Sequence, residues 1–361
     1  VAPVGLPPII GRHHPHYRAL AALPRYEEWR GLNVYRPHFA HIPGVGGRFD
    51  AAMLARALRP LLRTIRAEFP FDIIDASFFF PDGPAAVALG REMGVPVSIK
   101  ARGGDIHHWG AGGAARRQIV DAGQRADGLL SVCAALKQDM AAMAMPAERI
   151  RVHYTGIDRR IFYVRDRAAA KMAMGVAGPL IATVGALIPR KGQEQVIRAI
   201  ALVPDAQLVI IGQGPDRARL EQIASELGVA HRVRFTGSLP LADIADWLAA
   251  ADAMALASAS EGLANVWIEA LASGTPLVLN RIDSAAEVMD RPAAGCMVDP
   301  TPAAMAAGLQ SILRANPPRD DVAASVAAFS WDANAAHLHD HLASIVARYR
   351  AGRGGRPNAA R

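Results

Sequence analysis

The sequence lacks the features that mark several classes of protein. Its 361 residues include only two cysteines, Cys133 and Cys296, too few for a disulfide framework and without metal-ligand spacing. No apolar run approaches the roughly 18 residues that span a bilayer. Hydrophobic residues make up 51% and charged residues 20% of the chain, which is typical of a globular protein. We therefore expect a soluble or peripheral protein of a reducing compartment, the cytoplasm.

Two motifs of nucleotide chemistry are also missing. No Asp-x-Asp pair occurs, which argues against a transferase that holds a diphosphate through an aspartate-bound metal. No Gly-x-Gly-x-x-Gly follows a predicted strand with an acid about 20 residues later, so an NAD-dependent dehydrogenase is disfavoured. Because these two motifs are absent, we expect no metal site and no cofactor.

The whole chain has a net charge of +7, and much of the excess positive charge lies in its N-terminal part. Residues 1–60 hold eight arginines against three acids, a local excess of five. Four aromatic residues lie among them: Tyr17, Tyr26, Trp29 and Tyr35. This pattern favours a surface for anionic membrane headgroups or an anionic acceptor, although a solvated face explains it equally well. Because no nucleic-acid-binding motif accompanies the charge, we predict no nucleic-acid partner.

Short apolar runs alternate with alanine-rich helical patterns along most of the chain. The runs are residues 71–78, 95–101, 128–133, 150–156, 179–187, 206–214, 232–237, 252–258 and 275–280. Such alternation predicts an α/β fold of parallel sheets, too long for one doubly wound sheet. We therefore predict two Rossmann-like domains.

The pattern pauses around residue 167, which predicts domains at 1–167 and 168–330. An amphipathic stretch predicts a further helix at 331–350, crossing back toward the first domain. The Gly- and Arg-rich residues 351–361 are expected to be a disordered tail. The opening "VAPVGLPP" is typical of a strand end, so we expect that the natural first strand is missing.

Parallel sheets bind ligands at the carboxyl ends of their strands, and the unusual residues follow predicted strands. Arg190 and Lys191 precede a helix, where cations and free N–H groups meet an anion. In "ASASEGLANVWIEALASGTP", residues 264–273 predict a helix whose first turn suits a phosphate. Glu261 and Glu269 flank that turn and could accept hydrogen bonds from sugar hydroxyls. Two solvated acids remain the alternative.

The segment "SEGLANVWIEALASGTPLVLN" resembles the signature of glycosyltransferase family 4, in which seven residues separate two glutamates. "HYTGIDRRIF", "VGALIPRKG", "LVIIGQGP", "VRFTGSLP" and "SAAEVM" resemble further family segments in order and spacing. The resemblance covers most of residues 128–300. It implies a GT-B architecture, two Rossmann-like domains facing a central cleft with the C-terminal helix near their junction. It also implies a retaining nucleotide-sugar transferase.

The resemblance assigns roles to individual residues. Glu269 would hold the ribose hydroxyls of the donor, and Glu261 the hydroxyls of the transferred sugar. Lys191 and Arg190 would neutralise the phosphates and, with Glu261, form the catalytic group. The expected donor-binding backbone comprises Gly262, Leu263, Ala264, Asn265, Gly185, Gly212 and Gly214.

The chain departs from the family at two places. Ala186 stands where the family often has an arginine, and Arg102 stands where it commonly has a histidine. We therefore take the segment after residue 101 as the acceptor side, with Arg102, Gly103, Asp105, His107 and His108 as candidates.

The predicted activity is transfer of a sugar from a nucleoside-diphosphate sugar to a hydroxyl acceptor. The acceptor would be a lipid-linked saccharide of surface polysaccharide or glycolipid assembly, used at the inner face of a membrane. Residues 11–31 are the candidate acceptor or membrane-facing segment. A nucleotide-sugar 2-epimerase and a non-catalytic nucleotide-sugar-binding module remain as alternatives.

Overall fold

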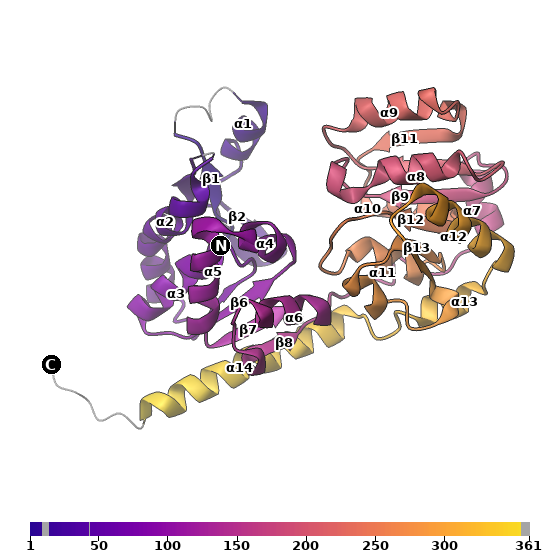
Figure 1. The fold of residues 1–361 in the computed structure, drawn as a ribbon. Helices are drawn as coiled ribbons and strands as arrows, with labels where there is room; N and C mark the ends of the chain where they lie inside the picture. The colour runs from indigo at the N-terminus through magenta and orange to yellow at the C-terminus, as the bar shows by residue number, and fades with distance from the viewer. Residues whose placement is uncertain (9–13, 43, 355–361) are drawn as a thin grey trace. The chain divides into compact units, whose positions relative to one another are not determined.

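The computed structural model describes residues 1–8, 14–42 and 44–354 (Figure 1). The chain divides into two compact units, Val1–His153 with the chain from His337 onward, and Tyr154–Ala336. The boundary after His153 comes earlier than the predicted domain boundary at residue 167. Residues 154–167 pack on the second unit, where Arg167 forms an ion pair with Asp252 and Arg159 donates to the Val326 carbonyl oxygen.

The second unit is built on one sheet of six parallel strands. The strands are β9 (Leu180–Val184), β10 (Gln207–Ile211), β11 (Val233–Gly237), β12 (Ala253–Leu256), β13 (Leu277–Asn280) and β14 (Gly295–Val298). Their order is β11-β10-β9-β12-β13-β14. Five were predicted from apolar runs, whereas β14, "GCMV", was not. Its run is short and contains a glycine, which disfavours a strand.

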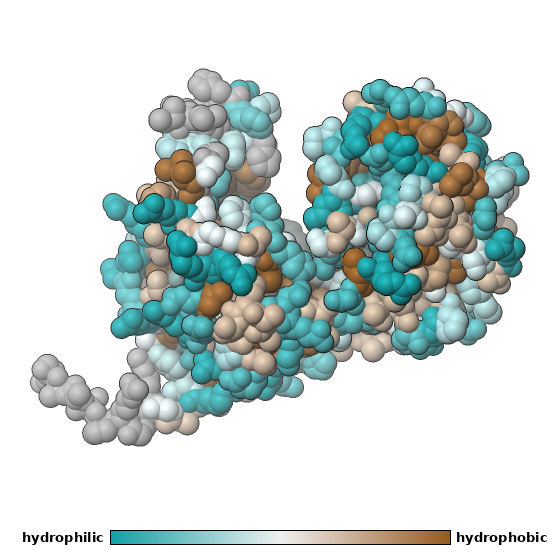
Figure 2. All heavy atoms as spheres, viewed as in Figure 1, coloured by the Kyte–Doolittle hydropathy of each residue, from teal (hydrophilic) through white to brown (hydrophobic). Residues whose placement is uncertain are grey.

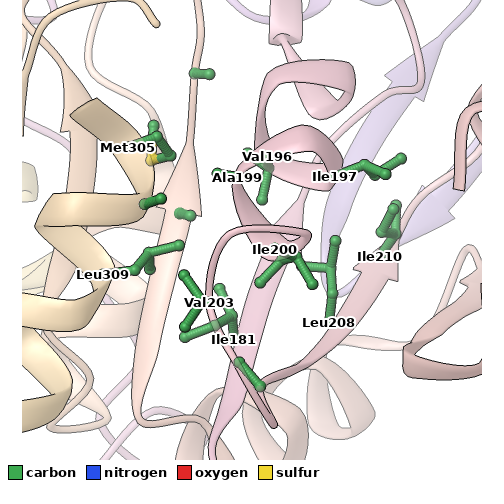
Figure 3. Close-up of a cluster of buried hydrophobic side chains, with 14 of the residues drawn as sticks. Ile181, Val196, Ile197, Ala199, Ile200, Val203, Leu208, Ile210, Met305 and Leu309 are labelled. Carbon is green, nitrogen blue, oxygen red and sulfur yellow. The ribbon is translucent and has the colours of Figure 1, made fainter. Parts of the chain in front are cut away.

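Helices cover both faces of this sheet, as a doubly wound fold requires. They are α7 (Arg167–Ala173), α8 (Gln193–Ile200), α9 (Arg217–Glu226), α10 (Leu241–Ala250), α11 (Asn265–Ala272), α12 (Pro302–Ala315) and α13 (Arg319–Ala324). One face packs against α8, α9 and α12 in a single apolar cluster, part of which Figure 3 shows. Ile181, Ile200 and Leu309 are completely buried there. In Figure 2 hydrophilic side chains cover the outer surface of α9, with apolar ones around β11.

The first unit contains a sheet of four parallel strands. They are β5 (Ile74–Ala76), β6 (Val97–Ala101), β7 (Gly128–Ser131) and β8 (Ile150–Val152), in that order. Its helices are α1 (Pro15–Ala21), α2 (Gly46–Glu68), α3 (Asp82–Met93), α4 (Gly104–His107), α5 (Gly113–Arg125) and α6 (Ala134–Ala142). Leu54 and Ala55 of α2 pack on Ala85 and Leu89 of α3.

The front of the first unit departs from a purely parallel design. β1 (Val4–Leu6) pairs in parallel with β4 (His38–Ala40) in a separate sheet. β2 (Tyr26–Trp29) and β3 (Leu32–Tyr35) form an antiparallel hairpin. Its two-residue turn, Arg30 and Gly31, has positive φ at both positions, the geometry that matches the twist of paired strands. No strand was predicted in this region apart from the opening one.

A groove of about 360 Å³ lies beside β5 in the first unit. Its lining includes Val1, Pro3 and the strand β5, with apolar side chains of α2 and α3. The expectation that a natural first strand is missing stays a prediction.

The last described helix, α14, runs from Trp331 to Gly354. The expected disordered tail is therefore wrong for residues 351–354, while residues 355–361 lie outside the described part. On the first unit, His341 Nε2 lies 3.2 Å from Ser98 Oγ. Arg350 donates to Asp72, and Gly128 lets Ile345 approach β7 closely.

Candidate functional site

The order of strands in the second unit reverses direction between β9 and β12. From β9 the chain proceeds outward to β10 and β11, then returns to β12 and continues the other way through β13. The loops after β9 and β12 therefore leave the sheet toward opposite sides. Such a switch point is where open parallel sheets bind ligands. The first loop carries Arg190 and Lys191, and the second carries Glu261.

The adjacent Arg190 and Lys191 form one charged cluster with Glu261, which lies seventy positions after Lys191 in the sequence. Lys191 Nζ lies 2.5 Å from Glu261 Oε1, and Arg190 Nη1 lies 3.5 Å from Glu261 Oε2. The side chains of Glu261 and Lys191 are only 9% and 15% exposed, whereas Arg190 is 45% exposed. Arg190 also donates to the Ser260 carbonyl oxygen. The cluster joins one nearly buried ion pair to a second cation that reaches solvent.

Backbone contacts hold the two loops together. The Ala259 N–H donates to the Arg190 carbonyl oxygen over 2.9 Å. Gly192 has φ +68°, and a Cβ there would lie 2.2 Å from the Ala257 carbonyl oxygen. Since no side chain fits that space, glycine is required for this close approach. The position of Lys191 opposite Glu261 therefore depends on the adjacent Gly192.

The helix α11 begins directly after Gly262–Ala264, one residue later than predicted. No side chain caps its N-terminus, so its first N–H groups, which have no partner within a helix, are available to a ligand. Gly262 and Leu263 are buried, and Asn265 is exposed. The arrangement suits an anion beside the Glu261 cluster.

Glu269 lies one turn into α11 and is half-buried. Burial raises the pKa of its carboxyl to about 7, because low polarity penalises the charged form. Among the described residues no side chain or N–H group bonds to this carboxyl; only the Glu269 backbone oxygen is used, accepting from Ser273. A buried carboxyl without a partner is costly, and ligand hydroxyls could satisfy it.

The glycines expected to contact the donor differ in their surroundings. A Cβ at Gly212 would lie 1.9 Å from the Gly185 carbonyl oxygen, and one at Gly214 would lie 2.2 Å from the Leu187 carbonyl oxygen. Both glycines thus allow the loop after β10 to pack on the loop after β9. Gly185 has more room, since its nearest neighbour would be Lys191 Cδ at 3.7 Å. Contact of these glycines with a donor stays a prediction.

Three polar residues that support the cluster were not predicted. Asn280, at the end of β13, accepts from Gln195 and donates to the Ala257 carbonyl oxygen. Ser284 donates to the Glu261 carbonyl oxygen over 3.3 Å. An asparagine ending the buried strand "LVLN" is the sequence signal that could have identified Asn280. Sequence offers no comparable signal for Gln195 or Ser284.

The acceptor-side candidates lie around the turn after β6 in the first unit. Asp105 is completely buried, and its carboxylate accepts from the backbone N–H groups of Phe79, Arg102, Gly103 and Ile106. Gly103 has φ +107°. Asp105 thus stabilises the turn itself, and its contact with an acceptor stays a prediction.

Three of the other four candidates, Arg102, His107 and His108, already have partners. Arg102 Nε donates to the Ser77 carbonyl oxygen over 2.6 Å. His107 Nε2 lies 2.9 Å from Asp139 Oδ2, and His108 packs edge-on against Trp109. A role in acceptor binding stays a prediction for these three.

The described residues show neither a metal-binding cluster nor a membrane-spanning helix. Within residues 1–8, 14–42 and 44–354, no group of three or more His, Cys, Asp or Glu side chains could hold a metal ion. In the same ranges, no helix has the length and apolar character needed to cross a bilayer.

Two family descriptions match the chain, one over each part. The family "Glycosyltransferase Family 4" matches residues 12–160, and "Glycosyl transferases group 1" matches residues 165–327. The boundary between the matches falls close to the division between the two units.

Curated relatives resemble part of the chain. A GDP-mannose-dependent alpha-(1-6)-phosphatidylinositol monomannoside mannosyltransferase of Mycolicibacterium smegmatis is 30% identical over 63% of this chain and 64% of its own length. The lipopolysaccharide core biosynthesis glycosyltransferase LpsE of Rhizobium meliloti is 34% identical over 42% of this chain and 43% of its own length. The chain therefore spans less than two thirds of these relatives.

Solved structures resemble the whole fold. Sucrose-phosphate synthase of Thermosynechococcus elongatus gives a TM-score of 0.77 at 18% identity, over 96% of this chain and 100% of that one. Anabaena Alr3699/HepE, solved in complex with UDP, gives 0.73 at 21% identity, over 86% of each chain. The GT-B fold predicted from the sequence is confirmed. The central cleft stays a prediction, because each unit is described by itself.

Proposed function

Because two glycosyltransferase domains in tandem make up most of this chain, we propose that it is a retaining, metal-independent glycosyltransferase. It would move a sugar from a nucleoside-diphosphate sugar to a hydroxyl acceptor. The observation that carries the proposal is the cluster of Glu261, Lys191 and Arg190 beside the uncapped start of α11. The named relatives, which are glycosyltransferases, support it.

Each part of the cluster suits one part of such a donor. The diphosphate would meet the N–H groups at the start of α11 and the guanidinium of Arg190, which is exposed enough to reach it. Glu261 would share its carboxylate between Lys191 and the sugar hydroxyls. Glu269 would accept hydrogen bonds from the ribose hydroxyls, which would satisfy a carboxyl that has no protein partner.

Catalysis would rest on fixed positive charge. As the bond between the anomeric carbon and the diphosphate breaks, negative charge grows on the departing phosphate. Lys191, Arg190 and the helix end would stabilise that charge, and loss of one such donor typically lowers the rate by about 100- to 1,000-fold. The departing phosphate would take the proton of the incoming hydroxyl, which attacks the same face. The anomeric configuration would then be retained.

The acceptor would be a glycan or lipid-linked saccharide bound by the first unit. Support comes from the basic front of the chain and from relatives named for phosphatidylinositol mannoside and lipopolysaccharide core synthesis. Work at the inner face of a membrane belongs to the same proposal. Within the candidate segment 11–31, residues 11–13 lie outside the described part; α1 and β2 occupy much of the rest.

Release of nucleoside diphosphate from a panel of UDP-, GDP- and ADP-sugars, with and without a lipid-linked acceptor extract, tests the activity. We expect acceptor-dependent release from one donor, lost in Lys191→Ala and Glu269→Ala. Glu221→Ala, which removes an exposed carboxylate of α9, is the matched control and should keep full activity. Isomerised donor without acceptor would identify an epimerase, and donor binding without turnover a binding module. An inverted product would refute the retaining mechanism.

A further inference from the structure

The N-terminal part of α2 exposes side chains that a helix packed on a sheet usually buries. Val45, Phe49 and Met53 are 48%, 43% and 37% exposed. Val45 directly precedes α2, and Phe49 and Met53, four residues apart, lie along one face of the helix. Leu54 and Ala55 fill the opposite, buried face. The helix is thus apolar on its solvent side as well as toward the core.

The same exposed face carries unneutralised positive charge. Arg48 and Arg56 are exposed, and the Arg48 guanidinium lies over the Phe49 ring, 5.4 Å from its centre, a cation–π contact. The helix contains only two acids: Asp50, which is buried and bonded to His41, and Glu68 at its last residue. Within the described residues 44–67, no acid of this segment therefore opposes these arginines on the exposed face.

Further along α2 the arginines are already engaged. Arg59 and Arg63 both form ion pairs with Glu92, and Arg66 donates to the Met93 carbonyl oxygen. The unpaired charge and the exposed apolar residues therefore coincide at the N-terminal half of the helix.

A hollow beside this half adds a third cation. It has a volume of about 480 Å³ and is lined by Arg48 of α2 and by Arg117 of α5, with Gln118 and Asp121. Asp121 is paired with Arg125. In the part of the chain that the structure describes, neither Arg48 nor Arg117 has an acidic partner. Two arginines thus line a space that could hold a phosphate group.

We propose that Val45, Arg48, Phe49, Met53, Arg56 and Arg117, here called the α2 face, dock on a bilayer that contains anionic lipids. Apolar side chains with interspersed arginines on one helix face suit the boundary between headgroups and acyl chains. Anionic headgroups supply the opposite charge, and the hollow between Arg48 and Arg117 receives a lipid phosphate. The α2 face lies in the first unit, so the inference does not depend on the donor chemistry of the second.

Flotation with vesicles of phosphatidylcholine, with or without phosphatidylglycerol, tests this inference. The wild-type chain should bind only the vesicles with phosphatidylglycerol, and less as salt rises. Arg48→Glu with Arg56→Glu should weaken binding by at least about 25-fold, since each basic residue near such a surface contributes roughly fivefold. Phe49→Ser with Met53→Ser should also weaken it. Arg91→Glu with Arg314→Glu, and Met172→Ser with Leu241→Ser, are matched exposed controls that should bind like the wild type.

Wild-type binding equal on both vesicles, or variants that bind like their controls, would overturn the inference. So would a concentration-dependent dimer that the Phe49→Ser and Met53→Ser changes abolish, because the α2 face would then join two copies of the chain. Circular dichroism verifies that each variant is folded. Titration with UDP-sugar tests the proposed function separately from membrane docking. All four double variants should bind the donor equally, whether or not they bind the vesicles.

Discussion

At the scale of single residues, Glu269 is the most informative side chain of the candidate site. Its carboxyl has a pKa of about 7 because it is buried, and no other described residue bonds to it. Ribose hydroxyls donate best to the ionised form, so protonation should compete with donor binding.

We expect donor affinity to fall as pH drops from 8 through 7 to 6. The folded-state pKa is raised, so the folded protein holds the proton up to about pH 7, and the donor must displace it. Glu269→Gln should bind donor weakly with no such pH dependence. Calorimetric titration measures the donor affinity of both proteins at each pH from 8 to 6. A wild-type affinity that is flat from pH 8 to 6 would contradict the role of Glu269.

The same shift predicts a change in stability. An acid with a raised folded-state pKa binds more protons folded than unfolded, so the free energy of unfolding should decrease as pH rises from 4.5 past 7. Glu269→Gln removes the ionised form and should raise the midpoint of thermal unfolding at pH 8 but change it little at pH 5. Calorimetry at pH 8 and pH 5 tests the sign of this change in the unfolding midpoint.

Gly192 permits a second prediction at this scale. Gly192→Ala should destabilise the second unit by about 1–3 kcal/mol more than Gly228→Ala, because the added Cβ overpacks the contact with Ala257. Both glycines have φ near +70°, but only a Cβ at Gly192 collides with a carbonyl oxygen, while that at Gly228 meets nothing within 4 Å. Urea denaturation of both variants isolates the close approach from the backbone strain. Equal losses would show that the loops separate easily.

At the scale of elements, the layer formed by α8 and α12 holds the loop after β9 in place. The C-terminal end of α8 inserts Ile200 into the apolar cluster beside Ile181 and Leu309 (Figure 3). Since α8 starts directly after Lys191 and Gly192, loosening this helix should disturb the charged cluster as well.

Ile200→Ala should lower the free energy of unfolding by about 2–5 kcal/mol, through lost burial and the cavity left behind. Leu202→Ala is the matched control, because Leu202 lies two residues later and is exposed. That change should stay within about 0.5 kcal/mol of the wild type. Similar losses for both variants, measured by urea denaturation, would mean that α8 is not held by its apolar face.

At the scale of the whole molecule, α14 returns the chain to the first unit after the second is complete. The helix places His341 in a buried position against Ser98 of β6. Burial, and the positive charge of Arg151, lower the pKa of His341 to about 4. The imidazole is therefore neutral in the folded protein at physiological pH.

Because the unfolded chain protonates this histidine near pH 6.5, the first unit should lose stability as pH falls from about 6.5 to 4. His341→Gln should reduce that pH dependence. Hydrogen exchange of α14 at pH 7 and pH 5 measures the effect. If its protection is the same in the wild type and the variant at pH 5, His341 does not control how α14 is held.

The sequence by itself determined the repeating strand-and-helix order, most strands of the parallel sheets and the loops that carry charge. Apolar runs predict buried strands because burial on both faces leaves little room for polar residues. The two glutamates, Arg190 and Lys191 could likewise be selected, since their residue types and their places before helices are local properties.

Only the tertiary structure decided which of these residues meet. Lys191 and Glu261 bond across seventy positions because β9 and β12 are neighbours, and strand order is not written in any local pattern. Burial, which depends on every packed neighbour, raised the pKa of Glu269 and enclosed Asp105. The antiparallel hairpin and the strand β4 of the first unit also escaped prediction, because these strands are too short to show a clear period.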